Sequence, residues 1–375
     1  MTTLARSDKS WFAEWWRTVD HGIITGVMVL LAAGMLLAMA AGPTAADRIG
    51  ISNPFHFVFR HAFFVMAGIA VFLSVSTLSE AWTRRLALLI FIVSFLLLAA
   101  IPVIGTQIKG SQRWIHIAGA SLQPSELVKP ALIVVAGWFL AQRNQVKGVP
   151  WAIIAFALFA PTIGLLLLQP DVGQTVLLTA TFLVAFFVSG MPLIWASFFL
   201  VGGLAAAALM FFQFEHVRYR IMTYLDPSQA SYQLQQAHDA ISRGGLLGVG
   251  PGEGRVKYYL PDVHTDFIYS VAGEEFGFLA CLGLLIIFLV IALRGMFAAA
   301  RRADPFVRAA GTALFFMFGA QAMINIGVNV GLLPTKGMTL PLISYGGSSM
   351  IGTALTLGFG LALTRKRAEF RLGIR

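Results

Sequence analysis

Ten apolar segments, each about as long as a bilayer is thick, constrain the fold of this 375-residue chain more than any other feature. A helix needs about 20 mostly apolar residues to cross the hydrocarbon core of a membrane. We place such helices at 22–41, 57–78, 84–104, 124–142, 150–168, 173–190, 193–212, 267–293, 308–330 and 347–364. Gln169, Pro170 and Asp171 interrupt the run 150–190, which is therefore divided in two. The predicted fold class is an all-α polytopic membrane protein.

The composition supports this class. Hydrophobic residues make up 58% of the chain and charged residues 12%, about half the charge of a soluble domain. A single cysteine, Cys281, excludes a disulfide within the chain and a metal–thiolate cluster. We expect one transmembrane domain at 22–364, a cytoplasmic segment at 1–21 and a basic cytoplasmic tail at 365–375. Despite the net charge of +10, we expect a membrane setting and no nucleic-acid partner.

The distribution of Lys and Arg predicts the orientation, because cytoplasmic loops are enriched in them. With the N-terminus in the cytoplasm, 16 of the 27 basic residues fall on inner segments, and ten spans return the C-terminus to the same side. Most of the others lie in three outer loops, 105–123, 213–266 and 331–346. An anionic ligand at the outer face would explain them. The alternative is that they bind lipid headgroups or nearby carboxylates.

The large outer loop 213–266 ends in GGLLGVGPGEGRVKYYLPDVHTDF, directly before the eighth apolar segment. Asp266 stands at the expected start of that helix, where a carboxylate is a natural cap. The alternative is a general base that takes a proton from an attacking hydroxyl, oriented by His264 and Thr265. The loop by itself leaves both interpretations open.

Two further features of this region have alternative explanations. Residues Tyr232–Ser242 suit a short amphipathic helix at the interface. The glycines after it could present N–H groups to a phosphate, or form a flexible turn. Glu274 and Glu275 are expected roughly 12–14 Å below Asp266 along the helix, protonated or paired with a basic residue of another helix.

The fourth apolar segment carries a second candidate cluster in SLQPSELVKPAL. Glu126 and Lys129 are three residues apart and share a helix face. They form either a self-neutralising structural pair or a site in which Lys129 faces a substrate pyrophosphate. Just before them, KGSQRWIHI places Lys109 and Arg113 on the outer side.

Polar residues also interrupt other apolar segments. Asp171 lies in QPDVGQT between two short runs, and Lys336 lies in GLLPTKGMTLPLISYGGSSM, whose Pro and Gly content predicts a tightly packed or re-entrant loop. Three amides recur every four residues on the ninth segment and are typical of contacts between helices: Gln321, Asn325 and Asn329.

Several of these motifs occur together in a known order. QPSELVKPA, QPDVGQT, GVGPGEG, LPDVHTDFIYSVAGEEFG and GLLPTKGMTLPLISYGGSS resemble, in order and spacing, the SEDS family (shape, elongation, division and sporulation). The resemblance covers about Asp20 to Arg367 and is nearer to the division branch than to the elongation branch. Two positions depart from the usual pattern, Asp262 where Glu is common and Tyr269 where Phe is common.

The resemblance implies a ten-helix peptidoglycan glycosyltransferase that polymerises lipid II, an undecaprenyl-pyrophosphate-linked disaccharide-pentapeptide, at the outer face of the bacterial inner membrane and at the septum. It implies Mg²⁺ or Mn²⁺, a class B penicillin-binding transpeptidase and other division proteins as partners. Asp266 matches the family's essential aspartate. The residues that we expect to contact substrate are Lys109, Arg113, Glu126, Lys129, Asp171, Arg218, His264, Thr265, Lys336 and Ser344.

The chemistry agrees with these residue types. A polyprenyl pyrophosphate leaves without a strong general acid, so a base and cationic stabilisation suffice for an inverting hexosyl transfer. Two alternative functions would depend on different residues of this set. A lipid II flippase would depend on Glu274, Lys129 and Asp171 within the membrane, and not on Asp266. A non-catalytic scaffold that recruits the transpeptidase would depend on lipid-facing surfaces and not on outer-loop charges.

Overall fold

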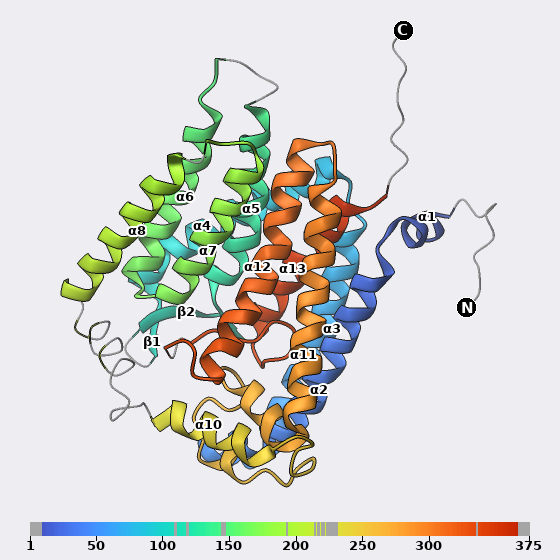
Figure 1. Cartoon of the computed structure of the whole chain (residues 1–375), viewed down its shortest axis with the longest axis vertical. Helices are drawn as coiled ribbons and strands as arrows, with labels where there is room; N and C mark the ends of the chain where they lie inside the picture. The colour runs from blue at the N-terminus through green and yellow to red at the C-terminus, as the bar shows by residue number, and fades with distance from the viewer. Residues whose placement is uncertain are drawn as a thin grey trace.

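The computed structural model describes residues 10–108, 111–117, 120–143, 148–192, 194–213, 215, 218, 222, 232–334 and 337–366. Its long helices pack side by side in one bundle (Figure 1). They are α2 (His21–Ile49), α3 (His56–Ser76), α4 (Glu80–Ile104), α5 (Pro124–Gln142), α6 (Trp151–Leu168), α7 (Val172–Val188), α8 (Ile194–Gln213), α11 (Ile268–Ala300), α12 (Pro305–Asn329) and α13 (Gly347–Thr364). Each coincides with one of the ten predicted segments, and the division at Gln169–Asp171 is confirmed as the turn between α6 and α7.

Eight of the described helices have the length and hydropathy of membrane spans, and α7 is a shorter apolar helix. Three of the eight form the centre of the bundle. In α5, α12 and α13, 72–89% of the apolar window is buried, against 22–39% in the other five. The peripheral helices thus keep most of their apolar surface for lipid, whereas the central three pack on protein.

Glycines allow the central helices to approach closely. A Cβ built on Gly137 of α5 would lie 2.9 Å from the Cβ of Ala310 of α12. A Cβ on Gly352 of α13 would lie 2.5 Å from the carbonyl oxygen of Glu126. Small residues at such crossings are the usual means of close helix packing within a membrane.

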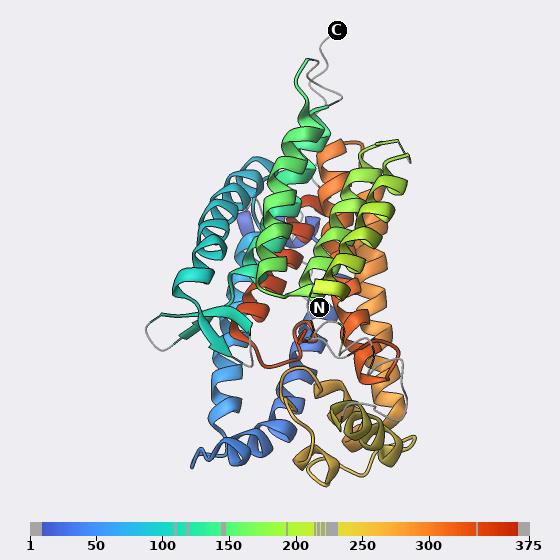
Figure 2. The same cartoon turned by 90° about the vertical axis from the view of Figure 1, so that its left-hand side faces the viewer.

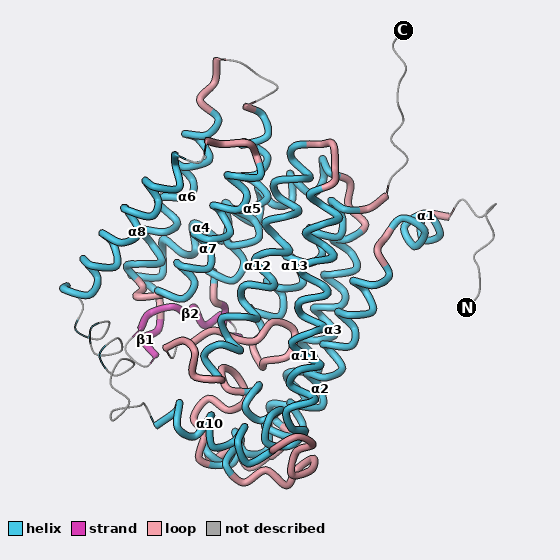
Figure 3. The backbone as a smooth tube through the Cα atoms, viewed as in Figure 1, coloured by secondary structure: helices cyan, strands magenta, loops and turns pink. Residues whose placement is uncertain are grey.

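The two ends of the bundle differ. One end, here the terminal end, carries the start of α2, the end of α13 and the short helix α1 (Trp11–Thr18). The other, the loop end, carries α10 (Tyr232–Gly244), the 3-10 turn η2 (Val256–Tyr258) and the segments around them (Figure 3). Helix α10 confirms the predicted amphipathic helix.

A small sheet, which the sequence pattern does not predict, lies in the 105–123 connection at the loop end (Figure 2). Its strands are β1 (Thr106–Ile108), β2 (Ser111–Ile117) and β3 (Ala120–Leu122), in the order β1-β2-β3 with both pairs antiparallel. Thr106 pairs with Trp114, and Ile115 pairs with Leu122. The sheet fixes Arg113, in the middle of β2, against the neighbouring helices.

Candidate active site

Asp266 lies directly before α11, and α12 holds its main chain. The amide nitrogens of Asn325 and Asn329 both donate to the carbonyl oxygen of Asp266, each at 2.9 Å. Asn329 also accepts hydrogen bonds from the backbone and hydroxyl of Ser270 in the first turn of α11. The amide stripe predicted as a contact between helices is therefore confirmed in that role, and two of its three members fix the position of Asp266.

The carboxylate of Asp266 is partly exposed and faces the segment after α12. A Cβ built on Gly337 would lie 3.5 Å from its Oδ2 atom, which is an ordinary van der Waals distance and places Gly337 directly beside the carboxylate. Asn325 reaches the same segment through the carbonyl oxygen of Met338, at 2.7 Å. Asp266 is thus held between α12 and the loop that leads to α13.

The neighbours His264 and Thr265 are tied to that loop through their main chain. The carbonyl oxygen of Thr265 accepts a hydrogen bond from the hydroxyl of Ser344, and that of His264 accepts one from the backbone of Tyr345 at 2.9 Å. The His264 ring packs on Phe57 of α3, with ring centroids 4.6 Å apart. The predicted residues His264, Thr265, Asp266 and Ser344 therefore lie together.

A buried polar cluster, here called the polar core, lies where α5, α7 and α12 meet. It consists of Glu126, Lys129, Gln174 and Gln321, each at most 5% exposed. The ammonium group of Lys129 lies 3.0 Å from Glu126 and donates to the side-chain oxygens of Gln174, at 2.6 Å, and Gln321, at 3.2 Å. Gln174 in turn donates to Glu126 at 2.6 Å. The predicted pairing of Glu126 with Lys129 is confirmed, and three helices share it.

Asp171 and Arg113 extend this cluster toward the sheet. Asp171 caps α7 by accepting from the backbone of Gln174, and its Oδ1 lies 3.5 Å from the Arg113 guanidinium. Burial raises the pKa of the Asp171 carboxyl, although the charge of Arg113 opposes the rise. Arg113 also donates to the carbonyl oxygens of Gln169, at 3.2 Å, and Pro170, at 2.6 Å. These contacts make Arg113 a brace for the α6–α7 turn, and its contact with substrate stays a prediction.

One hydrogen bond connects the polar core to the Asp266 region. Gln321, which accepts from Lys129, donates to the carbonyl oxygen of Thr339 at 3.3 Å. Thr339 lies in the same loop as Gly337, which faces Asp266. A continuous polar network thus runs from Arg113 through Lys129 to the loop beside Asp266. It contains or borders most of the predicted site residues that the structure describes.

The remaining predicted residues stand apart from this network. Arg218 is about half exposed and lies 3.9 Å from Glu215, so the described structure does not bring it to the site. Lys109 and Lys336 lie outside the described residues, and their proposed roles stay predictions.

Sequence reasoning did not assign three members of the network to the site: Gln174, Gln321 and Thr339. Gln174 lies in the QPDVGQT motif, and its spacing of three residues from Asp171 is the signal that could have found it. Gln321 was assigned to helix contacts alone, because the pattern did not reveal that its two polar atoms reach Lys129 and Thr339.

The glycine segment after α10 corrects two expectations. Its backbone N–H groups bind carboxylates of this chain: Gly252 donates to Glu275 at 2.9 Å, and Arg255, Val256 and Lys257 donate to Glu274 at 2.7–3.1 Å. These groups are therefore engaged and do not form a phosphate cradle. The expected pairing with a basic residue is confirmed for Glu275, but its partner is Lys257 of the 3-10 turn η2 and not a residue of another long helix of the bundle.

Lys257 completes this arrangement, here called the glycine clamp (residues 248–257 with Glu274 and Glu275). Its ammonium group lies 2.5 Å from Glu275 and donates to the carbonyl oxygens of Ala40, at 3.1 Å, and Gly252, at 3.4 Å. Helix α11 bends beside the clamp at Gly277, whose φ of 79° favours glycine. The clamp thereby joins the start of α11 to α2.

No group of three or more His, Cys, Asp or Glu side chains suited to a metal ion occurs among the described residues. This part of the chain therefore does not supply a complete protein ligand set for the divalent cation implied by the family resemblance. A Mg²⁺ ion that arrives with a pyrophosphate needs only one or two carboxylates from the protein.

Comparison with known proteins agrees with this fold, a bundle of membrane-spanning helices. The FtsW/RodA/SpoVE model, described as a cell cycle protein family, matches residues 21–369. The probable peptidoglycan glycosyltransferase FtsW of Caulobacter vibrioides is 47% identical over 366 residues, which cover 97% of this chain and 93% of that protein. The protein of the same name from Halorhodospira halophila is 35% identical over 373 residues, covering 95% and 94%.

Solved structures agree. A chain of a peptidoglycan synthase complex that coordinates polymerization and crosslinking superposes with a TM-score of 0.74 at 28% identity, covering 92% of this chain and 97% of that one. A mutant of the rod shape determining protein RodA of Thermus thermophilus gives 0.70 at 28% identity, covering 93% and 99%. This chain belongs to the FtsW/RodA/SpoVE family, which is the SEDS family that the motifs resemble.

Proposed function

We propose that this chain is a division-type peptidoglycan glycosyltransferase that polymerises lipid II, with Asp266 as general base. The observation that carries the proposal is the placement of a partly exposed carboxylate at the loop end, with its main chain fixed by two amides of α12. A general base must be held within reach of the hydroxyl that it deprotonates. The two amides hold the backbone of Asp266, and its partly exposed side chain lies beside the loop after α12.

The reaction is a single displacement. The acceptor hydroxyl loses its proton to Asp266 and its oxygen attacks the anomeric carbon of the donor. The bond from that carbon to the pyrophosphate oxygen breaks, and polyprenyl pyrophosphate departs with the electron pair. One displacement inverts the configuration, from an α-linked donor to a β-linked glycan. The leaving group carries its own negative charge, so cationic stabilisation replaces a strong general acid, unlike a two-carboxylate glycosidase.

Lys129 is the described cation best placed to respond to that charge. Its three acceptors are side chains on α5, α7 and α12, and one of them, Gln321, also contacts the loop beside Asp266. We propose that Lys129 stabilises the pyrophosphate through this connection, and that Lys336 and Lys109 add positive charge. A divalent cation bound to the pyrophosphate would supply further Lewis-acid stabilisation.

We further propose a setting for the reaction. The protein is embedded in a membrane through several apolar helices. In the proposed orientation both termini are cytoplasmic, so the loop end faces the outside of the bacterial inner membrane, where lipid II is used at the septum. A class B penicillin-binding transpeptidase and other division proteins are the proposed partners, supported by the structural similarity to a chain from a peptidoglycan synthase complex.

Polymerisation of lipid II by the purified full chain with its cognate transpeptidase, in Mg²⁺ or Mn²⁺, tests this proposal. We expect glycan ladders from the wild type and none from Asp266→Ala, with both proteins folded and bound to the partner. Transfer of lipid II across the membrane of proteoliposomes, measured in parallel, distinguishes the flippase alternative from the enzyme proposal. Transport without ladders, under conditions in which a related polymerase is active, would contradict the enzyme proposal, and activity in neither assay would favour the scaffold.

A further inference from the structure

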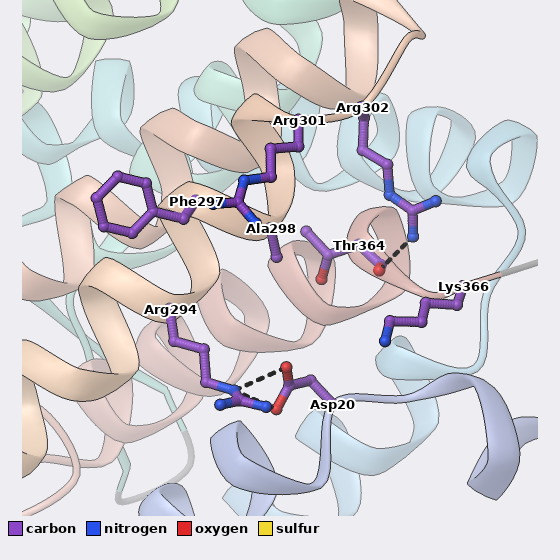
Figure 4. A pocket seen from close by; sticks show the side chains of 8 residues that line it. All are labelled: Asp20, Arg294, Phe297, Ala298, Arg301, Arg302, Thr364 and Lys366. Atoms are coloured by element: carbon purple, nitrogen blue, oxygen red, sulfur yellow. Dashed lines mark hydrogen bonds and ion pairs between the residues drawn. The ribbon is translucent and has the colours of Figure 1, made fainter.

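A basic pocket of about 500 Å³ lies at the terminal end of the bundle, far along α11 from Asp266 (Figure 4). The end of α11, the end of α13 and the residue that caps α2 form its walls. Four cationic side chains and one carboxylate line it: Arg294, Arg301, Arg302, Lys366 and Asp20. None of these residues belongs to the polar network of the candidate active site.

Contacts within the protein hold two of the cations in place. Arg294 approaches both carboxylate oxygens of Asp20 at 2.8 Å. A Cβ built on Gly22 would lie 3.0 Å from the Nε atom of Arg294, so the glycine leaves room for this pair. Arg302 donates to the carbonyl oxygens of Thr364 and Arg365, at the C-terminal end of α13. These contacts give the walls a defined shape.

The other two cations are uncommitted. Among the described residues, none forms a hydrogen bond or ion pair with the side chain of Arg301 or Lys366, and both side chains are exposed. Figure 4 shows them on opposite sides of the pocket, on different elements. Enrichment of cytoplasmic loops in basic residues accounts for their charge. That enrichment does not explain why two cations of the pocket bind other groups of the protein while the other two have no partner among the described residues.

Apolar groups beside the pocket indicate the plane of a membrane surface. Helix α1 exposes Trp11, Phe12 and Trp16, while the indole of Trp15 donates to Ser76 of α3. Aromatic residues on an amphipathic helix are typical of the headgroup region. The backbone of Lys366 donates to the carbonyl of Thr18 at the end of α1, which ties that helix to the pocket. Phe297, 60% exposed, lines the pocket itself.

We propose that this pocket binds the phosphate headgroup of an anionic membrane lipid, with Arg301 and Lys366 as its direct ligands. Guanidinium and ammonium groups bind phosphate oxygens through charge-assisted hydrogen bonds. The exposed Phe297 ring suits the glycerol and acyl part of the lipid better than a fully soluble anion. Bound lipid would join the ends of α11 and α13.

Lipid binding to the purified full chain tests the proposal, with phosphatidylglycerol as the probe and phosphatidylcholine as the neutral comparison. Native mass spectrometry counts retained lipid, and thermal unfolding measures the stabilisation that lipid gives. The variant Arg301→Gln/Lys366→Gln removes the two uncommitted cations. Arg85→Gln/Arg308→Gln is the matched control, because it removes two basic residues of the same end that do not line the pocket.

We expect the wild type and the control to retain phosphatidylglycerol, and the pocket variant to bind it at least about tenfold more weakly, as loss of two charge-assisted hydrogen bonds predicts. Matching unfolding temperatures without lipid would show that the variant is folded. Equal retention by all three proteins would overturn the proposal. Glycerol phosphate that protects the wild type as strongly as the lipid would overturn the lipid assignment, because it would identify a site for a soluble phosphate.

Discussion

The described part of the protein contains two buried Lys–Glu pairs, and they differ in what surrounds them. In the glycine clamp, two of the three acceptors of Lys257 are backbone carbonyls, and backbone N–H groups hold the glutamates. In the polar core, all three acceptors of Lys129 are side chains, on three different helices. Backbone partners are fixed by the fold, whereas side chains can exchange partners by rotation. We infer that the clamp serves folding and the polar core serves the reaction.

We expect the largest loss of stability when one partner of the ion pair in the glycine clamp is removed. Lys257→Met leaves Glu275 buried without its cation, which typically costs about 3–5 kcal/mol. We expect a large fall in unfolding temperature, measured in detergent, together with loss of activity through unfolding. Glu275→Gln/Lys257→Met, which removes both charges, is expected to recover most of the stability. A Lys257→Met protein as stable as the wild type would contradict a folding role for the clamp.

The backbone of the clamp is sensitive to a single methyl group. Gly248 has a φ of 83°, and a Cβ built on it would lie 2.1 Å from the carbonyl oxygen of Glu275. Gly248→Ala therefore combines a left-handed conformation, which costs about 1–2 kcal/mol, with a clash against backbone. Gly252→Ala is the control, since its φ of 84° is similar but nothing lies within 4 Å of the added Cβ. Equal destabilisation by the two changes would show that the close approach to α11 is unimportant.

Removing both charges of the polar core is expected to reduce activity and to leave stability nearly unchanged, the opposite of the effect in the glycine clamp. Glu126→Gln/Lys129→Met removes both charges of that pair, so stability should change little. We expect at least about a tenfold loss of polymerisation, equivalent to about 1.4 kcal/mol of transition-state stabilisation. The charge-neutral clamp variant Glu275→Gln/Lys257→Met should stay within about threefold of the wild type. If both double variants polymerise equally well, the functional distinction between the pairs is wrong.

The helices were predictable because a membrane span is recognised from the hydropathy of one continuous segment of about 20 residues, which needs no knowledge of tertiary contacts. The sheet at 106–122 was not predictable, because its strands are short. They lie in a loop for which the composition indicates only a polar character and a place on the outer side. The partners of Glu274 and Glu275 were not predictable, because the preceding loop folds back over the first turns of α11 and this fold is a tertiary feature.

The candidate site also has features that were predictable from the sequence and features that were not. Glu126 and Lys129 were paired correctly from their spacing on one helix. Their connection to the Asp266 region was not predictable, because it passes through Gln321 to Thr339 across a tertiary contact. Arg113 was assigned to substrate from its charge, and only the fold reveals that three atoms of the α6–α7 turn engage it.

The most direct test of the account is the rate of lipid II polymerisation by Asp266→Asn, measured together with its unfolding temperature. The change keeps the shape of the side chain and removes the basic oxygen. Asp262→Asn is the matched control, since Asp262 has a φ of 53° and Asn tolerates that conformation well. We predict an unchanged unfolding temperature and at least about a 100-fold loss of rate for Asp266→Asn, with Asp262→Asn within about threefold of the wild type. A folded Asp266→Asn protein that polymerises at the wild-type rate would contradict the assignment of Asp266 as the base.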